Sequence, residues 1–193
     1  MKKVLMVTQH YLHGKGGGVF ATRAFAGALA ECCGQVTLLC PTAPGKEPEG
    51  LDPRIRVVPV EDRRSRVRKL LALAAGRLHR YGTVFPEMLA KESYDLVFFD
   101  TCYPTQGLLE QAKRAGCRTV TLHHNCQWEY ERDNRRGPAR PLMLLWLPRC
   151  ERKALQKSDL NLTLTEADAA LLRERYDPRG HARIAVCPPF EPR

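Results

Sequence analysis

The sequence lacks the motifs that mark common metal, redox and hydrolase sites. Its eight cysteines include no Cys-x-x-Cys pair and show no spacing typical of a metal site or a disulfide framework. His123, His124 and Cys126 lie close together, but no fourth ligand follows at a useful spacing, so we expect no metal site. The Gly-x-Ser-x-Gly turn of serine hydrolases is also missing.

Long apolar segments are missing as well. No apolar run approaches the roughly 20 residues that a membrane-spanning helix needs. The basic start of the chain precedes an apolar run that is too short for the core of a secretory signal peptide. Free cysteines such as Cys40, inside strand-like segments, favour a reducing compartment. The sequence therefore predicts a cytoplasmic protein that is at most peripheral to the inner face of the cell membrane.

Acidic residues are scarce relative to basic ones. The chain has 31 Lys and Arg against 21 Asp and Glu, which gives a net charge of +10, so we expect an anionic partner. The aromatic residues do not alternate with the basic runs, and no nucleic-acid motif is present, so we expect no nucleic acid. Two segments, 63–80 and 135–153, combine arginines with an apolar run. Each fits either a buried helix with a solvated basic face or a contact with an anionic membrane.

Short apolar runs that alternate with helical patterns predict an α/β fold. The runs are rich in Val and Leu and mostly continuous, as in strands buried on both faces of a parallel sheet; they lie at 4–7, 36–39, 55–60, 95–99, 118–122, 160–164 and 183–186. With the helical segments between them, the order is β-α-β-β-α-α-β-α-β-α-β-α-β. We therefore predict a Rossmann-like, doubly wound, mainly parallel seven-stranded sheet with helices on both faces. This domain is expected to cover residues 1–186, and residues 187–193 are expected to begin a linker to a further domain.

Several residues mark the expected helix ends. Gly34 is placed to end a helix that starts after the first strand. Thr165 and Asp168 have the spacing of an N-cap and its partner, which predicts a helix that runs to Tyr176. A single long helix is expected over 141–158, after a mobile basic loop at 132–141.

A glycine-rich turn follows the first predicted strand. Gly16, Gly17 and Gly18 precede a helix whose N-terminus favours an anion or a polar ligand. The dinucleotide fingerprint fails, because its third glycine position is Val19, and no acidic residue ends the second strand. The Gly-Lys-Ser/Thr pattern of a P-loop is also absent. The alternative is a flexible turn that binds nothing.

Four segments resemble the family-4 glycosyltransferases of the GT-B fold. The opening "MKKVLMVTQHYLHGKGGGVFATRAFAGALAECCGQVTLLCP" is similar to the family's strand, Gly-Gly loop, helix and second strand, although Gly34-Gln35 replaces a Gly-His turn. The segment "DLVFFDTCYPTQGLLEQAKRAGCRTVTLHHNCQWEYE" resembles the fourth and fifth strands with a following "LHN" and Glu motif. The segments "ERKALQKSDLNLTLTEADAALLRERY" and "IAVCPPFEP" resemble the last helices and the strand before the interdomain linker.

The resemblance implies an acceptor-side domain of a two-domain enzyme. Such enzymes transfer a sugar, usually a hexose and with retention of configuration, from a nucleotide-sugar donor to a saccharide or lipid-linked acceptor, and they need no metal. Common roles are cell-surface polysaccharide and lipopolysaccharide biosynthesis. The donor-binding C-terminal domain is expected to be absent from this chain, so the isolated domain should be inactive. A cleft wall left exposed in this way could support a homodimer.

The resemblance also carries individual residues. Gly16, Gly17 and Gly18 match the loop that approaches donor phosphate or acceptor. His123 matches a catalytic histidine after the fifth strand, with His124 one position away; the alternative for His123 is a cap at the strand end. The remaining residues expected to bind donor or acceptor are Asp100, Thr101, His124, Glu129 and Arg132, and for the last two the alternative is a solvated loop.

A function outside the glycosyltransferases stays open from the sequence. The same α/β pattern would suit a stand-alone nucleotide- or phosphate-binding protein without transferase activity. The Cys/His pairs do not identify a nucleophile and its base.

Overall fold

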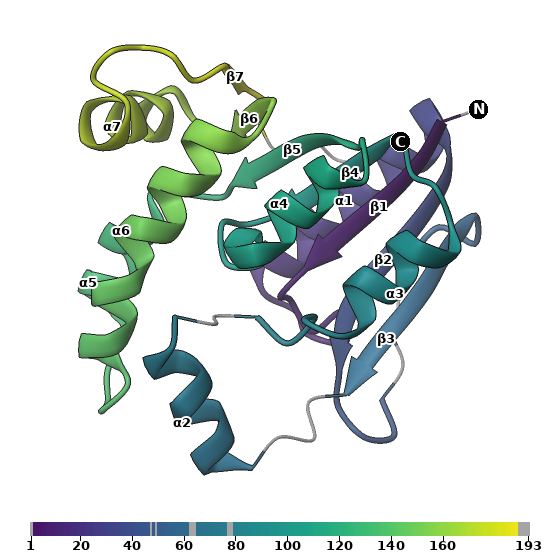
Figure 1. Ribbon diagram of the computed structural model, residues 1–193, viewed down its shortest axis with the longest axis horizontal. Coiled ribbons are helices and arrows are strands. Elements are labelled where there is room, and N and C mark those ends of the chain that lie inside the picture. Colours follow the sequence, from purple (N-terminus) through teal and green to yellow (C-terminus); the bar gives the residue numbers. More distant parts are fainter. Residues whose placement is uncertain (1, 47, 49, 62–64, 77–78, 189–193) are drawn as a thin grey trace.

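The computed structural model describes residues 2–46, 48, 50–61, 65–76 and 79–188 (Figure 1). All seven predicted strands are present and form one parallel sheet, with the spatial order β3-β2-β1-β4-β5-β6-β7. The predicted α/β fold is therefore confirmed. The strands are β1 (Lys2–Thr8), β2 (Gly34–Thr42), β3 (Ile55–Glu61), β4 (Leu96–Asp100), β5 (Arg118–His123), β6 (Leu160–Thr163) and β7 (Ile184–Val186).

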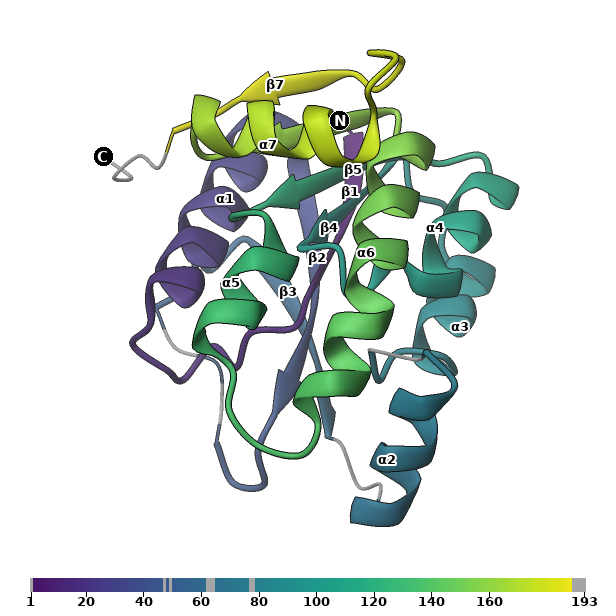
Figure 2. The ribbon, with the colours of Figure 1, turned by 90° about the vertical axis from the view of Figure 1, so that its left-hand side faces the viewer.

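Helices cover both faces of the sheet, as Figure 2 shows. Helix α1 lies on one face, and α3, α4 and α6 lie on the other. The helices among the described residues are α1 (Gly17–Cys33), α2 (Arg66–Ala74), α3 (Val84–Lys91), α4 (Thr105–Arg114), α5 (Gln127–Asn134), α6 (Arg140–Lys157) and α7 (Glu166–Tyr176). No helix of the described chain is both long enough and apolar enough to span a membrane.

The central strands are apolar throughout because each buries both of its faces. In β1, Val4 and Met6 pack with α1, whereas Leu5 and Val7 pack against the helices of the opposite face. Successive strand side chains point to opposite faces, so a continuous apolar run is what this position requires. Full burial of one such side chain stabilises the fold by about 2 kcal/mol.

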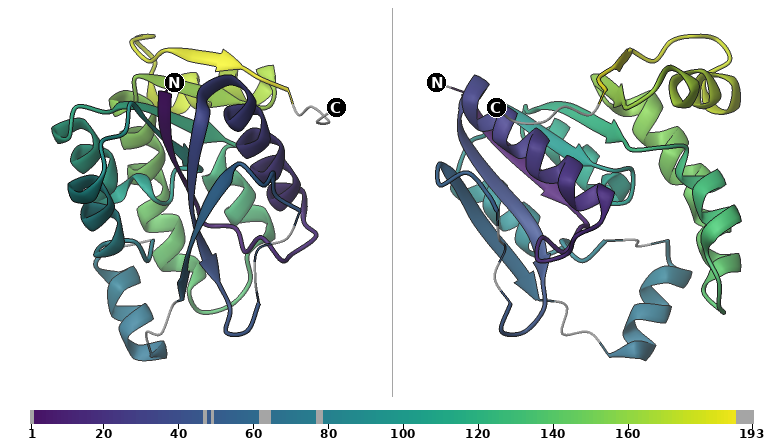
Figure 3. Two further views of the ribbon diagram at one scale, coloured as in Figure 1. Left: turned by 90° about the vertical axis from the view of Figure 1, so that its right-hand side faces the viewer. Right: turned by 180° about the vertical axis from the view of Figure 1, so that it is seen from behind.

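The sheet order reverses beside β1. The chain leaves β1 through α1 and adds β2 and β3 on one side, then crosses back and adds β4 on the other side of β1. In parallel α/β sheets, ligands bind outside the carboxyl ends of the strands at such a reversal. Helix α2 lies apart from the sheet at this same edge, as the two views in Figure 3 show.

The predicted helix ends are confirmed where local sequence determines them. Gly34 follows α1 with a φ of 95°, a value that glycine adopts without strain. Thr165 Oγ1 accepts a hydrogen bond from the backbone N–H of Asp168, 3.1 Å away, and so caps α7.

One prediction about the connection from β5 to β6 was wrong. Two helices lie there instead of one, because 127–134 forms α5 ahead of α6, so the expected basic loop at 132–141 is partly helical. The sequence of α5, "QWEYERDN", has no apolar stripe. Its N-terminus is capped by Glu151 of α6, which accepts hydrogen bonds from the N–H groups of Gln127 and Trp128. A cap from another helix leaves no local sequence signal.

Candidate functional site

A cavity of about 910 Å³ opens at the carboxyl edge of the sheet. Four neighbouring strands each deliver the residue that directly follows them to its wall: Gln9 after β1, Thr101 after β4, His124 after β5 and Leu164 after β6. The rest of the wall comes from the start of α1, the β4–α4 turn, α5 and the start of α6; these residues include Gly17, Gly18, Phe20, Tyr103, Asn125, Gln127, Tyr130, Glu131, Arg135 and Met143. The cavity therefore lies where the strand order reverses, as the fold predicts.

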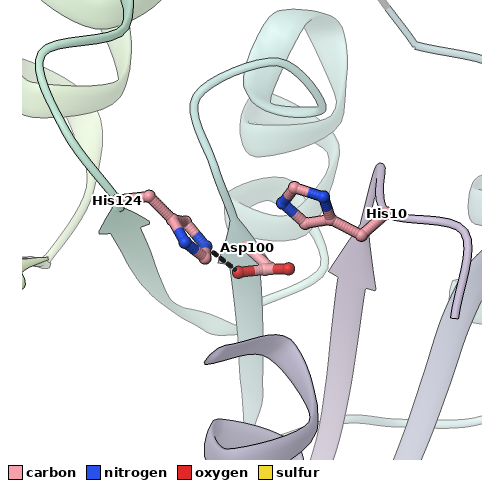
Figure 4. Close-up of side chains that lie close together, drawn as sticks. All are labelled: His10, Asp100 and His124. Atoms are coloured by element: carbon pink, nitrogen blue, oxygen red, sulfur yellow. Dashed lines mark hydrogen bonds and ion pairs between the residues drawn. The ribbon is translucent and has the colours of Figure 1, made fainter. Parts of the chain in front are cut away.

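A buried carboxylate lies beneath the cavity between two histidines (Figure 4). His124 Nε2 lies 2.6 Å from Asp100 Oδ1, and the hydroxyls of Thr8 and Thr22 donate to Asp100 Oδ2 at 2.6 and 2.5 Å. The ring of His10 stands on the other side of the carboxylate, with its centroid 5.4 Å from that of His124. The two threonines thus fix the carboxylate, and both imidazoles face the cavity above it.

The protonation of these groups follows from burial and from each other's charge. Burial alone would raise the pKa of Asp100, but the charge and hydrogen bond of His124, with smaller contributions from His10 and Thr22, lower it to about 2. Burial tends to lower the pKa of His124, but the Asp100 charge and hydrogen bond raise it above its ordinary value. Burial also lowers the pKa of His10, and the attraction of Asp100 only partly offsets this. At neutral pH the site therefore holds an ionised carboxylate beside a neutral His10.

The three glycines of the loop, Gly16, Gly17 and Gly18, have different surroundings. A Cβ added to Gly18 would lie 2.5 Å from Cε1 of His10, so only glycine allows this ring to lie where it does. A Cβ on Gly16 or Gly17 would meet no atom within 4 Å. One glycine thus makes room for the protein's own histidine, and the other two leave open space.

Four buried polar atoms around the cavity have no hydrogen-bond partner among the described residues. They are Gln9 Nε2, His10 Nε2, Thr101 Oγ1 and Asn125 Oδ1. Buried polar groups in native proteins are nearly always hydrogen-bonded, and an unpaired one costs about 1–3 kcal/mol. Donors and acceptors around one cavity suit a ligand with several hydroxyl groups, since each hydroxyl both donates and accepts.

Thr101, which lines this cavity, has a strained backbone. Its φ is 101°, and it is the only described residue other than glycine with a positive φ. For a β-branched residue this conformation costs on the order of 1–3 kcal/mol. Its N–H donates to the carbonyl of Leu122 at 3.0 Å, which joins β4 to β5 one residue beyond the regular ladder. The strain is one of the features that cluster at ligand sites.

The structure brings five of the nine predicted site residues to the cavity. Gly17, Gly18, Thr101 and His124 line it, and Asp100 lies beneath it. Gly16 precedes α1 as its N-cap residue outside the wall.

The remaining three predicted residues lie elsewhere. His123 is buried, its Nε2 3.1 Å from Asn161 Oδ1 on β6, and burial lowers its pKa to about 4. The pleat points the side chains of His123 and His124 in different directions, so only His124 reaches the cavity. Glu129 and Arg132 lie on α5, not in a loop, and belong to a surface network in which Glu129 Oε1 accepts from Arg175 at 2.8 Å.

Sequence reasoning missed several residues of the wall. His10 follows β1 by two residues, and its position at a strand end was the signal that could have identified it. Glu131 and Arg135 form an ion pair on the far wall, where Tyr103 Oη donates to Glu131 Oε1 at 2.7 Å. Glu131 and Arg135 lie on α5 and at its C-terminal end, and the sequence analysis did not predict this helix.

The group His10, Asp100 and His124 has the donor atoms of a metal site. One ligand atom from each lies within 4.8 Å of the others. However, Thr8 and Thr22 occupy Asp100 Oδ2, and His124 is bonded to Oδ1. A divalent cation would have to displace the His124 hydrogen bond to enter, so the arrangement fits a hydrogen-bonded cluster better than a preformed cation site.

Comparison with known families gives one match over most of the chain. The model of a family described as "Glycosyl transferase 4-like domain" matches residues 16–189. A search of curated proteins gives no match.

Solved structures share the fold at low sequence identity. Sucrose-phosphate synthase from Thermosynechococcus elongatus aligns with a TM-score of 0.72 and 14% identity, over 97% of this chain and 48% of that one. HepE from Anabaena, in complex with UDP and glucose, aligns with a TM-score of 0.57 and 14% identity, over 99% and 45%. The lipopolysaccharide outer core galactosyltransferase WaaB aligns with a TM-score of 0.51 and 14% identity, over 95% and 44%. This chain therefore spans a little under half the length of each of these structures.

Proposed function

Since this chain belongs to the glycosyl transferase 4-like domain family, we propose that it is the acceptor-side half of a glycosyltransferase. The whole enzyme transfers a sugar from a nucleotide-sugar donor to a saccharide or lipid-linked acceptor. The observation that carries this proposal is the set of four unpartnered polar atoms around one cavity, formed by Gln9, His10, Thr101 and Asn125. The hydroxyl groups of a bound sugar would supply the missing partners once these side chains rotate toward the cavity, because the four atoms are buried as they stand.

The geometry suggests a role for each group. Thr101 and Asn125 hydrogen-bond acceptor hydroxyls, and Gly17 leaves space for the sugar or for donor phosphate to approach. His124 takes the role that the sequence predicted for His123, because it faces the cavity and donates hydrogen bonds when protonated. Asp100 holds His124 in position and favours its charged form.

We propose that a second domain of the whole enzyme binds the donor. The HepE chain in complex with UDP and glucose is about twice as long as this chain, which aligns with 45% of it. We propose that the chain alone does not complete transfer, that the reaction retains anomeric configuration and needs no metal, and that a chelator leaves the activity of the whole enzyme unchanged. The WaaB likeness favours cell-surface polysaccharide or lipopolysaccharide assembly in the cytoplasm.

The test is a pair of neighbouring substitutions in the whole enzyme. His124→Gln is expected to lower kcat by about 100-fold, because it removes the imidazole whose charged form Asp100 favours beside the cavity. His123→Gln is expected to keep kcat within a few-fold of wild type, because its ring bonds Asn161 away from the cavity. Transfer is followed by release of nucleoside diphosphate from a panel of nucleotide sugars.

Two results would contradict the proposal. No release with any nucleotide sugar in the panel would rule out transferase activity. Full activity of His124→Gln together with loss in His123→Gln would return the role to His123.

A further inference from the structure

Helix α2 presents an apolar face to solvent. Val67, Leu70 and Leu71 are 67, 55 and 64% exposed. Their spacing of i, i+3 and i+4 places them on one side of the helix. Single exposed apolar residues are ordinary, whereas three on one turn and a half of helix indicate a contact surface.

The same helix is positively charged and has no acidic residue. Arg68 and Lys69 are exposed beside the apolar face, and the whole segment 63–80 contains arginine, lysine and histidine but neither aspartate nor glutamate. This combination of basic and apolar side chains fits an anionic bilayer better than a protein partner of mixed charge. Such a bilayer attracts basic groups at its surface and accepts apolar side chains just below it.

Helix α2 is held against the wall of the cavity. Leu73 packs on the cluster formed by Cys102, Met143 and Leu147, and Met143 also lines the cavity. At the end of the helix, Gly76 has a φ of 72°, and a Cβ there would lie 2.9 Å from the Trp146 ring. This close packing couples the position of α2 to that of α6.

We propose that the exposed face of α2, formed by Val67, Leu70 and Leu71 with Arg68 and Lys69, docks on the surface of an anionic lipid bilayer. Docking through α2 sets the carboxyl edge of the sheet toward the membrane, because α2 lies at that edge (Figure 3). The cavity mouth is then within reach of an acceptor whose lipid part stays in the bilayer. In terms of the proposed function, this selects the lipid-linked acceptor over a free saccharide.

The test is sedimentation of the chain with lipid vesicles, which requires no transfer activity. We expect the chain to bind phosphatidylcholine vesicles that contain phosphatidylglycerol. This binding should weaken as salt is added. Replacing Val67, Leu70 and Leu71 together by Ser is expected to weaken binding on the order of 100-fold, because the inserted apolar area is lost. Circular dichroism and thermal unfolding check that this variant stays folded, which is expected for exposed positions.

A matched pair of charge reversals locates the contact. Arg68→Glu on α2 is expected to weaken binding by at least about fivefold. Arg118→Glu, at the exposed start of β5 on the opposite edge of the sheet, changes net charge equally and is expected to have little effect. Equal losses in both variants, equal binding to uncharged vesicles, or unchanged binding of the triple variant would overturn the proposal. Because binding is measured without substrates, these outcomes are independent of any failure to find transferase activity.

Discussion

Gly18 and His10 form a packed pair at the start of α1. The ring of His10 occupies the space that a side chain at position 18 would need. The three consecutive glycines therefore do not share one purpose. Gly18 is needed to position a cavity residue, whereas an added Cβ on Gly16 or Gly17 would meet no atom within 4 Å, and of these two only Gly17 lines the cavity.

Two alanine substitutions separate these purposes. Gly18→Ala is expected to lower the free energy of unfolding by about 1 kcal/mol, because the clash with His10 outweighs the gain in helix propensity. Gly17→Ala is expected to raise it by about 0.5 kcal/mol, because Gly17 is a helical residue with open space around its Cα. Urea unfolding of both variants measures the difference.

The activity of the Gly17→Ala variant then tests the ligand. If donor or acceptor approaches this backbone, the variant raises KM although the protein is more stable. An equal gain in stability in the two variants would contradict the contact at Gly18.

Helix α5 owes its position to another helix. Glu151 is fully buried on α6, and its Oε1 and Oε2 accept from the N–H groups of Gln127 and Trp128 at 2.5 and 3.2 Å, while Tyr176 donates to Oε2 at 2.8 Å. Burial raises the pKa of Glu151 to about 7, although these three hydrogen bonds lower it in part. The helix that carries much of the cavity wall thus depends on a group that titrates near neutral pH.

A pH-dependent stability is expected from Glu151. Its pKa is higher in the folded protein than in the unfolded chain, so the folded state binds the extra proton between pH 4.5 and 7. The stabilisation is complete below the unfolded pKa and is lost as pH rises through about 7. Relative to Glu151→Gln, which does not titrate, wild type is expected to lose about 2 kcal/mol of unfolding free energy from pH 5 to pH 8. Urea unfolding of both proteins at several pH values measures this difference, and a constant difference would show that Glu151 does not titrate in this range.

The elements that the sequence predicted are those whose signals are local. Strands buried on both faces produce unbroken apolar runs, and the cap of α7 lies three residues from the group that it bonds. Helix α5 was missed for two reasons. Its cap, Glu151, lies 24 residues away from Gln127 in the sequence, and the residues of α5 form no apolar stripe.

The candidate site was predicted in part for the same reason. The carboxyl ends of parallel strands share one edge of the sheet, so the sequence grouped Thr101 and His124 with the glycine loop, and all of them line the cavity. Asp100 was grouped with them too, and it lies beneath the cavity, bonded to His124 and Thr22. The choice between His123 and His124 depends on the last residue of β5, and strand ends are not determined by apolar pattern to within one residue. The place of His10 in the cavity wall was not predicted, because it depends on the packing of its ring on Gly18.

At the scale of the whole molecule, the cavity rim exposes large aromatic side chains. Phe20 and Tyr130 line the cavity, yet they are 49 and 51% exposed. Rims of this kind mark surfaces that a partner covers. Under the proposed function, a second domain would be that partner, and a second copy of this chain could take its place.

We therefore expect the isolated chain to form a dimer at high concentration through this rim. Replacing Phe20 and Tyr130 by Ser is expected to keep it monomeric, because the shared apolar area is removed. Leu145→Ser is the control, since Leu145 is 52% exposed on α6 and does not line the cavity. Light scattering across a concentration series decides, and a monomer at every concentration would contradict the expectation.

The order of strands in the sheet divides the chain into two contiguous parts. Residues up to Glu61 contain β1, β2 and β3, which form one side of the sheet, and everything from α2 onward contains β4 to β7 on the other side. Among the residues that the structure describes, the only strand pairing that joins the two parts is β1 with β4. His10 belongs to the first part, whereas Asp100 and His124 belong to the second. During synthesis, the first part leaves the ribosome carrying the glycine loop but no carboxylate beneath it. The cavity therefore forms only when β4 pairs with β1. If the chain were produced as two fragments divided after Glu61, the cavity would form again only when the fragments reassociate through the pairing of β1 with β4.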